Sequence, residues 1–433
     1  MKFTTAVLAA TLIAEGAALY ATPAGAQSPL ESLRRQQRGQ REEPRPQPQP
    51  QQQQSARVQS LSREENAAIM PAYQAVQALD WAAASAALPA AQAGAQSPYA
   101  RYVVGQLTLE IGRGTQSLPM QSQAVDAMIA SGGAPAEALG PLLAAQIAFA
   151  LDANNFAVAE SSLTRFIEAN PNDTARVIQL AQVKNRLNKK QEALTLYRRA
   201  IQLTEAGGQR ASEDQYRGAL AIAYEGRMAE PALELSRTLV TYYPTPANWR
   251  SALGVYRELG GSQEGMRIDL SRLMRAAGAL GSERDYYEYA EAANRAGLPG
   301  EAKAVLDEGL GRNMFTTGIG AARTLLGLAT ARVAEDRAAM AGLRTRALAG
   351  GSGRDARTTG DVYFGYAQYA EAAALYRAAL EKGGEDANLV NTRLGAALAL
   401  AGQRADAETA FRAITGPRAD LARFWLLWLS TRT

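Results

Sequence analysis

Two of the main catalytic side chains are missing from this 433-residue chain, which has no His and no Cys. Their absence excludes thiolate nucleophiles, iron–sulfur clusters, disulfides and Ser-His-Asp triads. Metal sites built on His or Cys ligands are excluded as well. Any chemistry must therefore come from carboxylates, hydroxyls, Arg and Lys.

Glycine-rich stretches and acidic pairs are the motifs left to examine. The Gly-Gly-Ser-Gly stretch at 350–353 lacks the Lys-Ser/Thr of a phosphate-binding loop, and the stretch 105–114 follows no predicted strand. Both are predicted to be turns between helices. The acidic pairs 42–43 and 64–65 lie in or beside a polar tail, and no carboxylate cluster has calcium-loop spacing. The sequence therefore predicts no catalytic residue, no cofactor, no metal site and no enzyme activity.

A recurring pattern predicts the elements that would position a binding site. A small residue is followed four residues later by a large apolar one, and three residues after that by another apolar or small one. These spacings place the marked residues on one face of a helix. The copies recur every 33 to 40 residues, clearly at Ala159/Leu163/Phe166, Ala193/Tyr197/Ala200, Ala302/Leu306/Gly309, Ala372/Tyr376/Ala379 and Ala407/Phe411/Ile414, and more weakly at sites such as Ala232/Ser236/Leu239 and Ala339/Leu343.

A second helical segment precedes the marked ones, for example at 215–224, 285–296 and 388–401. Gly-rich or polar turns separate the two segments, so each unit is predicted to be helix–turn–helix. Longer spacings predict loop insertions near 112–114 and within 206–210. Because one helix pair cannot bury its apolar face alone, the units must stack.

The period, the helix pair and the pattern of small and large residues resemble the tetratricopeptide repeat. The residues that carry the resemblance are Leu394-Gly395, Ala407 and Phe411 in the unit 388–420, Gly360, Ala372 and Tyr376 one unit earlier, and the closing prolines Pro171 and Pro244. The resemblance implies an all-α fold, a right-handed helical-hairpin solenoid of about ten repeats that forms a TPR-like superhelix. It covers 63–433, with a terminal capping helix. The alternative for the apolar chain end is an exposed docking patch of Trp425, Leu427 and Trp428.

The N-terminal segment is predicted to direct export. Residues 1–26 combine Lys2, a short apolar run and an Ala-Gly-Ala cleavage pattern, which is typical of a signal peptide. The apolar run is shorter than the roughly 20 residues of a spanning helix. We therefore predict a periplasmic or secreted protein without a transmembrane segment after cleavage; an uncleaved anchor is the alternative. Residues 27–62 are rich in Gln, Pro and Arg, which predicts a disordered linker, either a solvated tether or a weak attractor of anionic polymers.

The first helix of each unit lines the concave groove in tetratricopeptide-like arrays, so the resemblance implies that side chains there bind the partner. Interleaved arginine and aromatic residues are common at binding hot spots. Alignment of the units places at such positions Arg217, Tyr224, Arg250, Arg284, Tyr287, Asn294, Arg323, Arg354, Arg357 and Phe364.

These features predict a non-enzymatic protein–protein interaction scaffold in the cell envelope, which binds an extended peptide or a partner protein in its concave groove. The alternative is a subunit of an envelope machine that exports or assembles polysaccharide, in which Tyr287 and Trp249 would stack on glycan. Nucleic acid is not an expected partner, because the basic excess belongs mainly to the N-terminal segment.

Overall fold

The computed structural model describes residues 60–260, 264–350 and 352–432, and every regular element in these ranges is a helix. The predicted signal peptide and nearly all of the predicted linker lie outside the described residues. The first described helix begins at Arg63, where the Ser62 hydroxyl and the Glu65 carboxylate form a reciprocal capping box. None of the described helices combines the length and apolarity that a membrane crossing requires.

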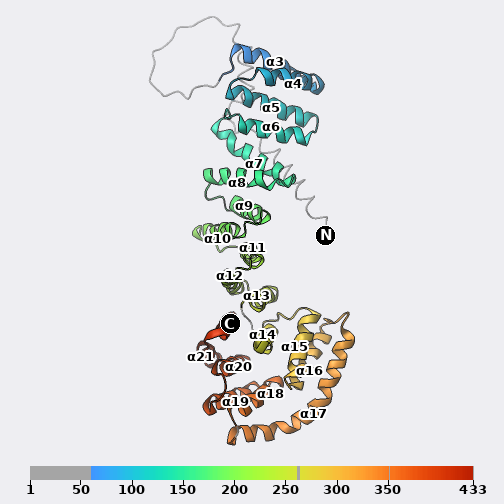
Figure 1. The fold of residues 1–433 in the computed structure, drawn as a ribbon, viewed down its shortest axis with the longest axis vertical. Coiled ribbons are helices and arrows are strands. Elements are labelled where there is room, and N and C mark those ends of the chain that lie inside the picture. Colours follow the sequence, from blue (N-terminus) through green and yellow to red (C-terminus); the bar gives the residue numbers. More distant parts are fainter. Residues whose placement is uncertain (1–59, 261–263, 351, 433) are drawn as a thin grey trace. The chain divides into compact units, whose positions relative to one another are not determined.

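The chain divides after Gly207 into two compact units. In the first unit the described helices form successive hairpins, and each helix packs mainly against those next to it in sequence (Figure 1). These helices are α3 (Arg63–Gln77), α4 (Trp81–Gly94), α5 (Pro98–Gly114), α6 (Leu118–Ala130), α7 (Ala136–Asp152), α8 (Phe156–Ala169), α9 (Thr174–Arg186) and α10 (Lys190–Ala206).

The second unit continues the hairpins and adds two helices that are not part of a pair, α17 and α22. Its helices are α11 (Glu213–Glu225), α12 (Ala229–Tyr242), α13 (Pro246–Leu259), α14 (Arg267–Ala276), α15 (Glu283–Arg295), α16 (Pro299–Gly311), α17 (Ile319–Ala349), α18 (Gly353–Gly365), α19 (Tyr369–Lys382), α20 (Ala387–Leu400), α21 (Arg404–Arg412) and α22 (Ala419–Ser430). Two short 3₁₀ turns, η1 (Glu264–Met266) and η2 (Gly416–Arg418), precede α14 and α22.

The predicted pattern of small and large residues forms the seam inside each hairpin. Ala372 and Tyr376 of α19 and Phe411 of α21 are buried. A Cβ atom added at Gly360 would lie 2.7 Å from the Tyr376 ring, and one at Gly395 would lie 2.5 Å from the Phe411 ring. Because both distances are far inside van der Waals contact, only glycine lets the two helices approach this closely. The all-α, tetratricopeptide-like hairpin solenoid expected from the sequence is confirmed.

The turn inside a hairpin places one residue in the left-handed region. Asn154 (φ 54°) and Asn188 (φ 60°) do so in the first unit, and Arg227 (φ 50°) and Ala367 (φ 57°) do so in the second. Asn tolerates this conformation better than residues without a short polar side chain. Leu79 (φ 59°) and Gln116 (φ 56°) adopt the same conformation in two other turns of the first unit, so turns with strained backbone occur in both units.

Residues 319–349 depart from the predicted repeat. The weak copy at Ala339/Leu343 predicted a hairpin, but the segment is one 31-residue helix, α17, and Ala339 is exposed. This prediction was wrong because the segment holds no Pro or Asn to form a turn, while Ala, Leu and Arg favour helix throughout. The described helices therefore comprise nine hairpins together with α17 and α22.

The glycines of α5 were also misassigned. The predicted turn at 105–114 and the insertion at 112–114 are wrong, because α5 runs unbroken to Gly114. A Cβ atom at Gly105 would lie 2.5 Å from Met128 Cγ of α6, and one at Gly114 would lie 2.3 Å from the Trp81 ring. These glycines allow close helix packing rather than a turn. The predicted insertion within 206–210 is confirmed as the non-helical segment after α10.

The C-terminal segment forms the predicted terminal helix, α22, but this helix packs on more than the last hairpin. It contacts α12 as well as α20 and α21. The Phe424 ring lies 6.3 Å from that of Trp249 and 5.8 Å from that of Tyr256, both on α13. Trp425 and Trp428 are buried, so the alternative of an exposed docking patch is wrong.

A second contact, between α14 and α20, closes the second unit further. Arg393 Nε of α20 donates to Asp269 Oδ1 of α14 at 3.1 Å, although the two residues are 124 positions apart. Trp428 Nε1 of α22 donates to the Ala276 carbonyl at the end of α14 at 3.1 Å. The hairpins of the second unit thus turn back on themselves, and α22 joins their last members to α12, α13 and α14.

Candidate interaction surface

Three successive first helices, α11, α13 and α15, carry most of the predicted partner-binding residues. Four of these residues are exposed, namely Arg217, Tyr224, Arg250 and Arg284. Two on α15 are half-buried, namely Tyr287 and Asn294. The structure therefore places this part of the predicted set on the surface of one unit.

The exposed arginines of α11 and α15 form ion pairs along their own helices. Arg217 Nη1 lies 3.2 Å from Glu213 Oε1, and Arg284 Nε lies 2.6 Å from Glu288 Oε1. Their side chains remain 50% and 80% exposed. Exposed pairs of this kind contribute about 0–1 kcal/mol, so a partner carboxylate can replace the internal one at little cost.

Contacts between helices make one continuous surface of these side chains. Asn248 Nδ2 of α13 donates to Glu213 Oε1 of α11 at 3.0 Å, and the Tyr224 hydroxyl of α11 donates to the Glu258 carboxylate of α13. The bond to Glu258 raises the pKa of Tyr224. The pKa of Arg284 is raised first by its bond to Glu288, and Glu258 adds to this effect.

Arg250 of α13 extends this surface toward α15, because its Nε donates to the Ala279 carbonyl just ahead of that helix at 2.9 Å. We call the exposed set Arg217, Tyr224, Arg250, Glu258 and Arg284 the first-helix surface. It holds three arginines and one glutamate, and a tyrosine lies among them.

The remaining predicted residues lie elsewhere in the unit. Arg323 is exposed on α17. Arg354 and Arg357 of α18 both bind Glu385, at 3.4 Å and 2.6 Å. Phe364 is not on a surface: its ring is buried, and the Arg272 guanidinium lies 4.0 Å from the ring centroid. Phe364 is therefore unavailable to a partner, because α14 covers it.

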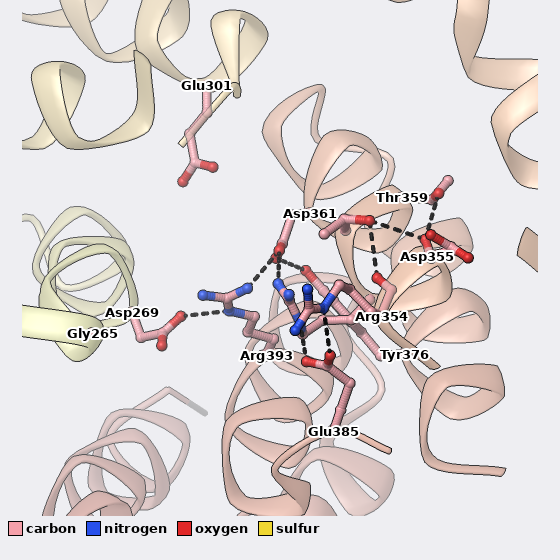
Figure 2. Close-up of polar contacts among 12 residues, drawn as sticks. Gly265, Asp269, Glu301, Arg354, Asp355, Thr359, Asp361, Tyr376, Glu385 and Arg393 are labelled. Carbon is pink, nitrogen blue, oxygen red and sulfur yellow. Dashed lines mark hydrogen bonds and ion pairs between the residues drawn. The ribbon is translucent and has the colours of Figure 1, made fainter. Parts of the chain in front are cut away.

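A network of buried charges was not predicted from the sequence. Figure 2 shows Arg393 between Asp269 and Asp361, bonded to them at 3.1 Å and 2.5 Å. Arg272 donates to both carboxylate oxygens of Glu301, at 2.8 Å and 2.7 Å. We call the buried ion network the set Asp269, Arg272, Glu301, Asp361, Arg393 and Arg418, which joins α14, α16, α18, α20 and η2.

The network keeps its charged forms because opposite charges outweigh burial. Burial alone would raise the pKa of Glu301, but the charge and hydrogen bonds of Arg272 bring it below its ordinary value. Burial likewise opposes ionisation of Asp269, and Arg393, Arg418 and Arg272 lower its pKa. Burial alone would lower the pKa of Arg272, but the charge and hydrogen bonds of Glu301 raise it well above that of a free guanidinium.

The geometry of the network suits cohesion rather than catalysis. Its carboxylates are bound by arginines, and Tyr289 and Tyr376 donate to Glu301 and Asp361 at 2.6 Å and 2.8 Å. Within the described ranges, no cluster of three or more acidic residues is arranged to hold a metal ion. One sequence signal pointed to the network: Arg272 lies between Leu270 and Leu273 on the apolar face of α14.

No family model and no curated protein matches the chain. The chain is similar to solved structures. A tetratricopeptide repeat protein from Parabacteroides merdae ATCC 43184 is 10% identical, with 78% of this chain and 100% of that chain covered and a TM-score of 0.26. The structure of Naa15/Naa10 bound to HypK-THB gives 12% identity, 83% and 65% coverage, and a TM-score of 0.27. The class assigned here, an all-α tetratricopeptide-like solenoid, rests on the hairpin seams themselves.

Proposed function

We propose that this protein is a non-enzymatic scaffold of the cell envelope that binds an extended peptide or a partner protein along its first-helix surface. The observation that carries the proposal is the continuity of that surface, which the Tyr224–Glu258 and Asn248–Glu213 bonds provide between α11 and α13, and which the bond from Arg250 to the Ala279 carbonyl extends toward α15. A tyrosine among exposed arginines is a composition common at protein-binding hot spots.

The residue types of the chain support a binding role over a catalytic one. Without His and Cys, the sequence lacks the usual general base and the usual activated nucleophile. The envelope location is part of the proposal and rests on the signal-peptide features of residues 1–26.

The glycan alternative has less support. Trp249, one of the two aromatic residues expected to stack on sugar, is 2% exposed and packs against Phe424. Tyr287 is only half-exposed. A protein partner therefore remains the better proposal.

The test is capture of a partner from envelope extract by the full chain, compared with a variant carrying Arg217→Glu, Tyr224→Ala and Arg284→Glu. We expect one protein to co-purify stoichiometrically with the wild type and to be lost with the variant. Arg412→Glu, on the second helix α21, is the matched surface control and should retain the partner. Retention of the wild type on purified glycan without a protein partner would favour the polysaccharide alternative, and capture unaffected by the variant would overturn the proposal.

A further inference from the structure

The terminal helix α22 packs between the last and the earlier helices of the second unit. On one side, its Trp425 ring stacks on the Phe411 ring of α21, with the ring centroids 5.6 Å apart. On the other side, its Phe424 ring packs against Trp249 and Tyr256 of α13. It also contacts α12 and the end of α14. We call the surface that α22 covers, formed by α12, α13, α14 and α21, the α22 site.

The fit of α22 to its site is imperfect at Trp425. This side chain is fully buried, yet its Nε1 has no hydrogen-bond partner within the described chain. A buried donor without an acceptor loses its hydration and gains no bond in return, so it weakens the packing of the helix that carries it. The helix also begins without a side-chain cap, because Arg418 stands at its N-cap position. Both features indicate that another helix could fill the site better than α22 does.

The polar links of α22 to the earlier helices can be released without leaving a buried charge alone. Asp420 accepts from Arg237 of α12 at 3.0 Å, but it also pairs with Arg423 of its own helix at 2.8 Å. The N-cap residue of α22 binds Asp269 at 2.7 Å, and Asp269 keeps a second bond, to Arg393 at 3.1 Å. Removal of α22 therefore uncovers aromatic rings but leaves each of these carboxylates with an arginine.

The contacts of α22 define what a replacement helix must carry. Phe424 and Trp428 are four residues apart, so they share one face, and this face meets α13 and α14. Trp425 meets α21, and Asp420 meets Arg237 one turn ahead of Phe424. A fitting helix therefore has two aromatic residues four positions apart, a carboxylate one turn ahead of the first, and an apolar residue without a buried donor in place of Trp425.

We propose that α22 is an internal occupant of this site, and that an aromatic amphipathic helix of the partner protein takes its place when the partner binds the first-helix surface. The inference rests on the proposed function, because the same partner must engage both surfaces. Helix α13 carries both: Trp249 and Tyr256 are buried beneath α22, whereas Arg250 and Glu258 are exposed.

Tethering explains why both surfaces are needed. A helix joined to its own site has an effective concentration on the order of millimolar, so a free helix of equal fit would not displace it. A partner that is already anchored at the first-helix surface is tethered too. The two helices then compete on equal terms, and the one with the better fit occupies the site.

A second copy of the chain is not the expected source of the replacement. Its α22 carries the same Trp425 with the same unpaired indole, so it has no advantage over the tethered helix. A helix with phenylalanine at this position keeps the stacking on Phe411 and has no donor to bury. The imperfection of α22 therefore favours a helix of another sequence.

The probe is a fluorescent peptide of residues 416–432, compared with the same peptide carrying Trp425→Phe. Binding of each to the full chain is measured by fluorescence anisotropy. The chain variants Phe424→Ala and Asp420→Asn loosen the internal helix and leave its site unchanged. We expect them to bind the peptides tighter than the wild type does, by roughly tenfold or more and by about threefold. The Trp425→Phe peptide should bind about fivefold tighter than the α22 peptide.

A crosslink distinguishes exchange at the α22 site from binding elsewhere. The chain has no Cys, so Arg237→Cys with Asp420→Cys can be joined by a short bismaleimide that ties α22 to α12. The crosslinked chain should not bind the peptides, and the same variant without the crosslink should bind them. Arg377→Glu, on α19, is the surface control and should bind as the wild type does. Thermal melting followed by circular dichroism verifies that each variant is folded, and Asp420→Asn, at a partly exposed ion pair, keeps the test valid if Phe424→Ala unfolds.

Absence of binding to both loosened variants would overturn the proposal, as would binding that survives the crosslink. Equal affinity of the two peptides would contradict the imperfect fit of α22. Undiminished capture of the partner by the crosslinked chain would show that the partner does not use this site, and dimers of the wild type that the crosslink abolishes would identify a second copy as the occupant. Because the first-helix surface is intact in every variant except through Phe424, Asp420 or Arg237, which lie outside it, failure of peptide exchange leaves the proposed function standing, and failure to capture a partner leaves the exchange result standing.

Discussion

The two units of this chain use the same hairpin but are stabilised in different ways. In the first unit, helices pack mainly on their sequence neighbours, and the ends of the array are not joined. In the second unit, α14 packs on α20 and α22 packs on α12, so helices from opposite ends of the unit hold one another. When the later helices of a repeat array pack against the earlier ones, the stability of the array no longer depends on contacts between sequence neighbours alone.

This difference has a consequence for unfolding. In an array with nearest-neighbour contacts, stability is approximately a sum over hairpins and their interfaces, so a local defect stays local. In the second unit the buried ion network joins five elements, and a defect there should spread through all of them. Tryptophan fluorescence can follow this unit, because Trp249, Trp425 and Trp428 lie in it and only Trp81 lies in the first.

The largest expected effect comes from Glu301→Gln. The substitution leaves the buried Arg272 without its closest counter-charge, and breaking a buried pair in this way costs about 3–5 kcal/mol. The equivalent change in the first unit, Glu160→Gln, should cost about 1 kcal/mol or less, because Lys184 keeps its ion pair with Glu192 and Lys189 remains largely in contact with water. Urea unfolding followed by tryptophan fluorescence and circular dichroism measures both losses.

The double variant Arg272→Met with Glu301→Gln is the control for this prediction. It removes both charges and keeps an acceptor for the Tyr289 hydroxyl, which donates to Glu301 at 2.6 Å. We expect it to recover much of the lost stability. Equal losses for Glu301→Gln and Glu160→Gln would contradict the contrast between the units.

A second prediction concerns the hairpin seams. Ala372→Leu in α19 and Ala193→Leu in α10 each overpack a fully buried position, at a typical cost of about 1–3 kcal/mol. Hydrogen exchange should differ between them: faster exchange should stay near α9 and α10 for Ala193→Leu but should reach α14 and α20 for Ala372→Leu. Ala405→Leu, at an exposed site of α21, is the control and should change neither the stability nor the hydrogen exchange of the chain. Exchange confined to α18 and α19 in the Ala372 variant would argue against a closed second unit.

A third prediction concerns acid. The pKa values of Asp269 and Glu301 are lowered in the folded state. The stability that these groups contribute is therefore present above their unfolded pKa values of about 4, and it is lost as pH falls through the lowered values. The chain has no His, so we expect its melting temperature to be nearly constant between pH 5 and 8.

The pKa of Glu160 in the first unit is also lowered, by its bonds to Lys184 and Lys189. The pKa of Glu65 in the first unit is lowered as well. Glu65 and Glu160 act at separate places, whereas the network of the second unit links several carboxylates through shared arginines, so the second unit should unfold first as pH falls below 4. Melting curves from pH 2 to 8, followed by tryptophan fluorescence and circular dichroism, separate the two units. Loss of helix before loss of the tryptophan signal would contradict this order.

The contacts that could be predicted from the sequence are those within and between neighbouring helices. Ala372 and Tyr376 are four residues apart on one helix, so their spacing alone predicts a shared face. The exposure of Arg217 and Arg284 followed from the alignment of first helices. These inferences need only local periodicity, which the chain displays repeatedly.

The contacts that could not be predicted are those between helices that are distant in the sequence and that meet only because the second unit closes on itself. Asp269 and Arg418 are 149 positions apart and meet at 2.7 Å, with no spacing rule to link them. Phe364 occupies the aligned position of an exposed residue, yet α14 covers it with Arg272. Phe424 of α22 also packs against the buried Trp249, which the polysaccharide alternative expected to stack on glycan.

The smallest expected effect concerns the hairpin turns, and it separates turns closed by asparagine from turns closed by other residues. Ala367 has a φ of 57°, a conformation that costs a non-glycine residue about 1–2 kcal/mol, so Ala367→Gly should stabilise the second unit by about 1 kcal/mol. The same change at Asn188 of the first unit, where φ is 60°, should gain less because Asn tolerates this conformation. Ala401→Gly, at a φ of −79°, is the control and should destabilise by roughly 0.5–1 kcal/mol. Thermal melting of the three variants measures these effects, and an equal gain at Ala367 and Asn188 would show that alanine and asparagine are equally strained in these turns.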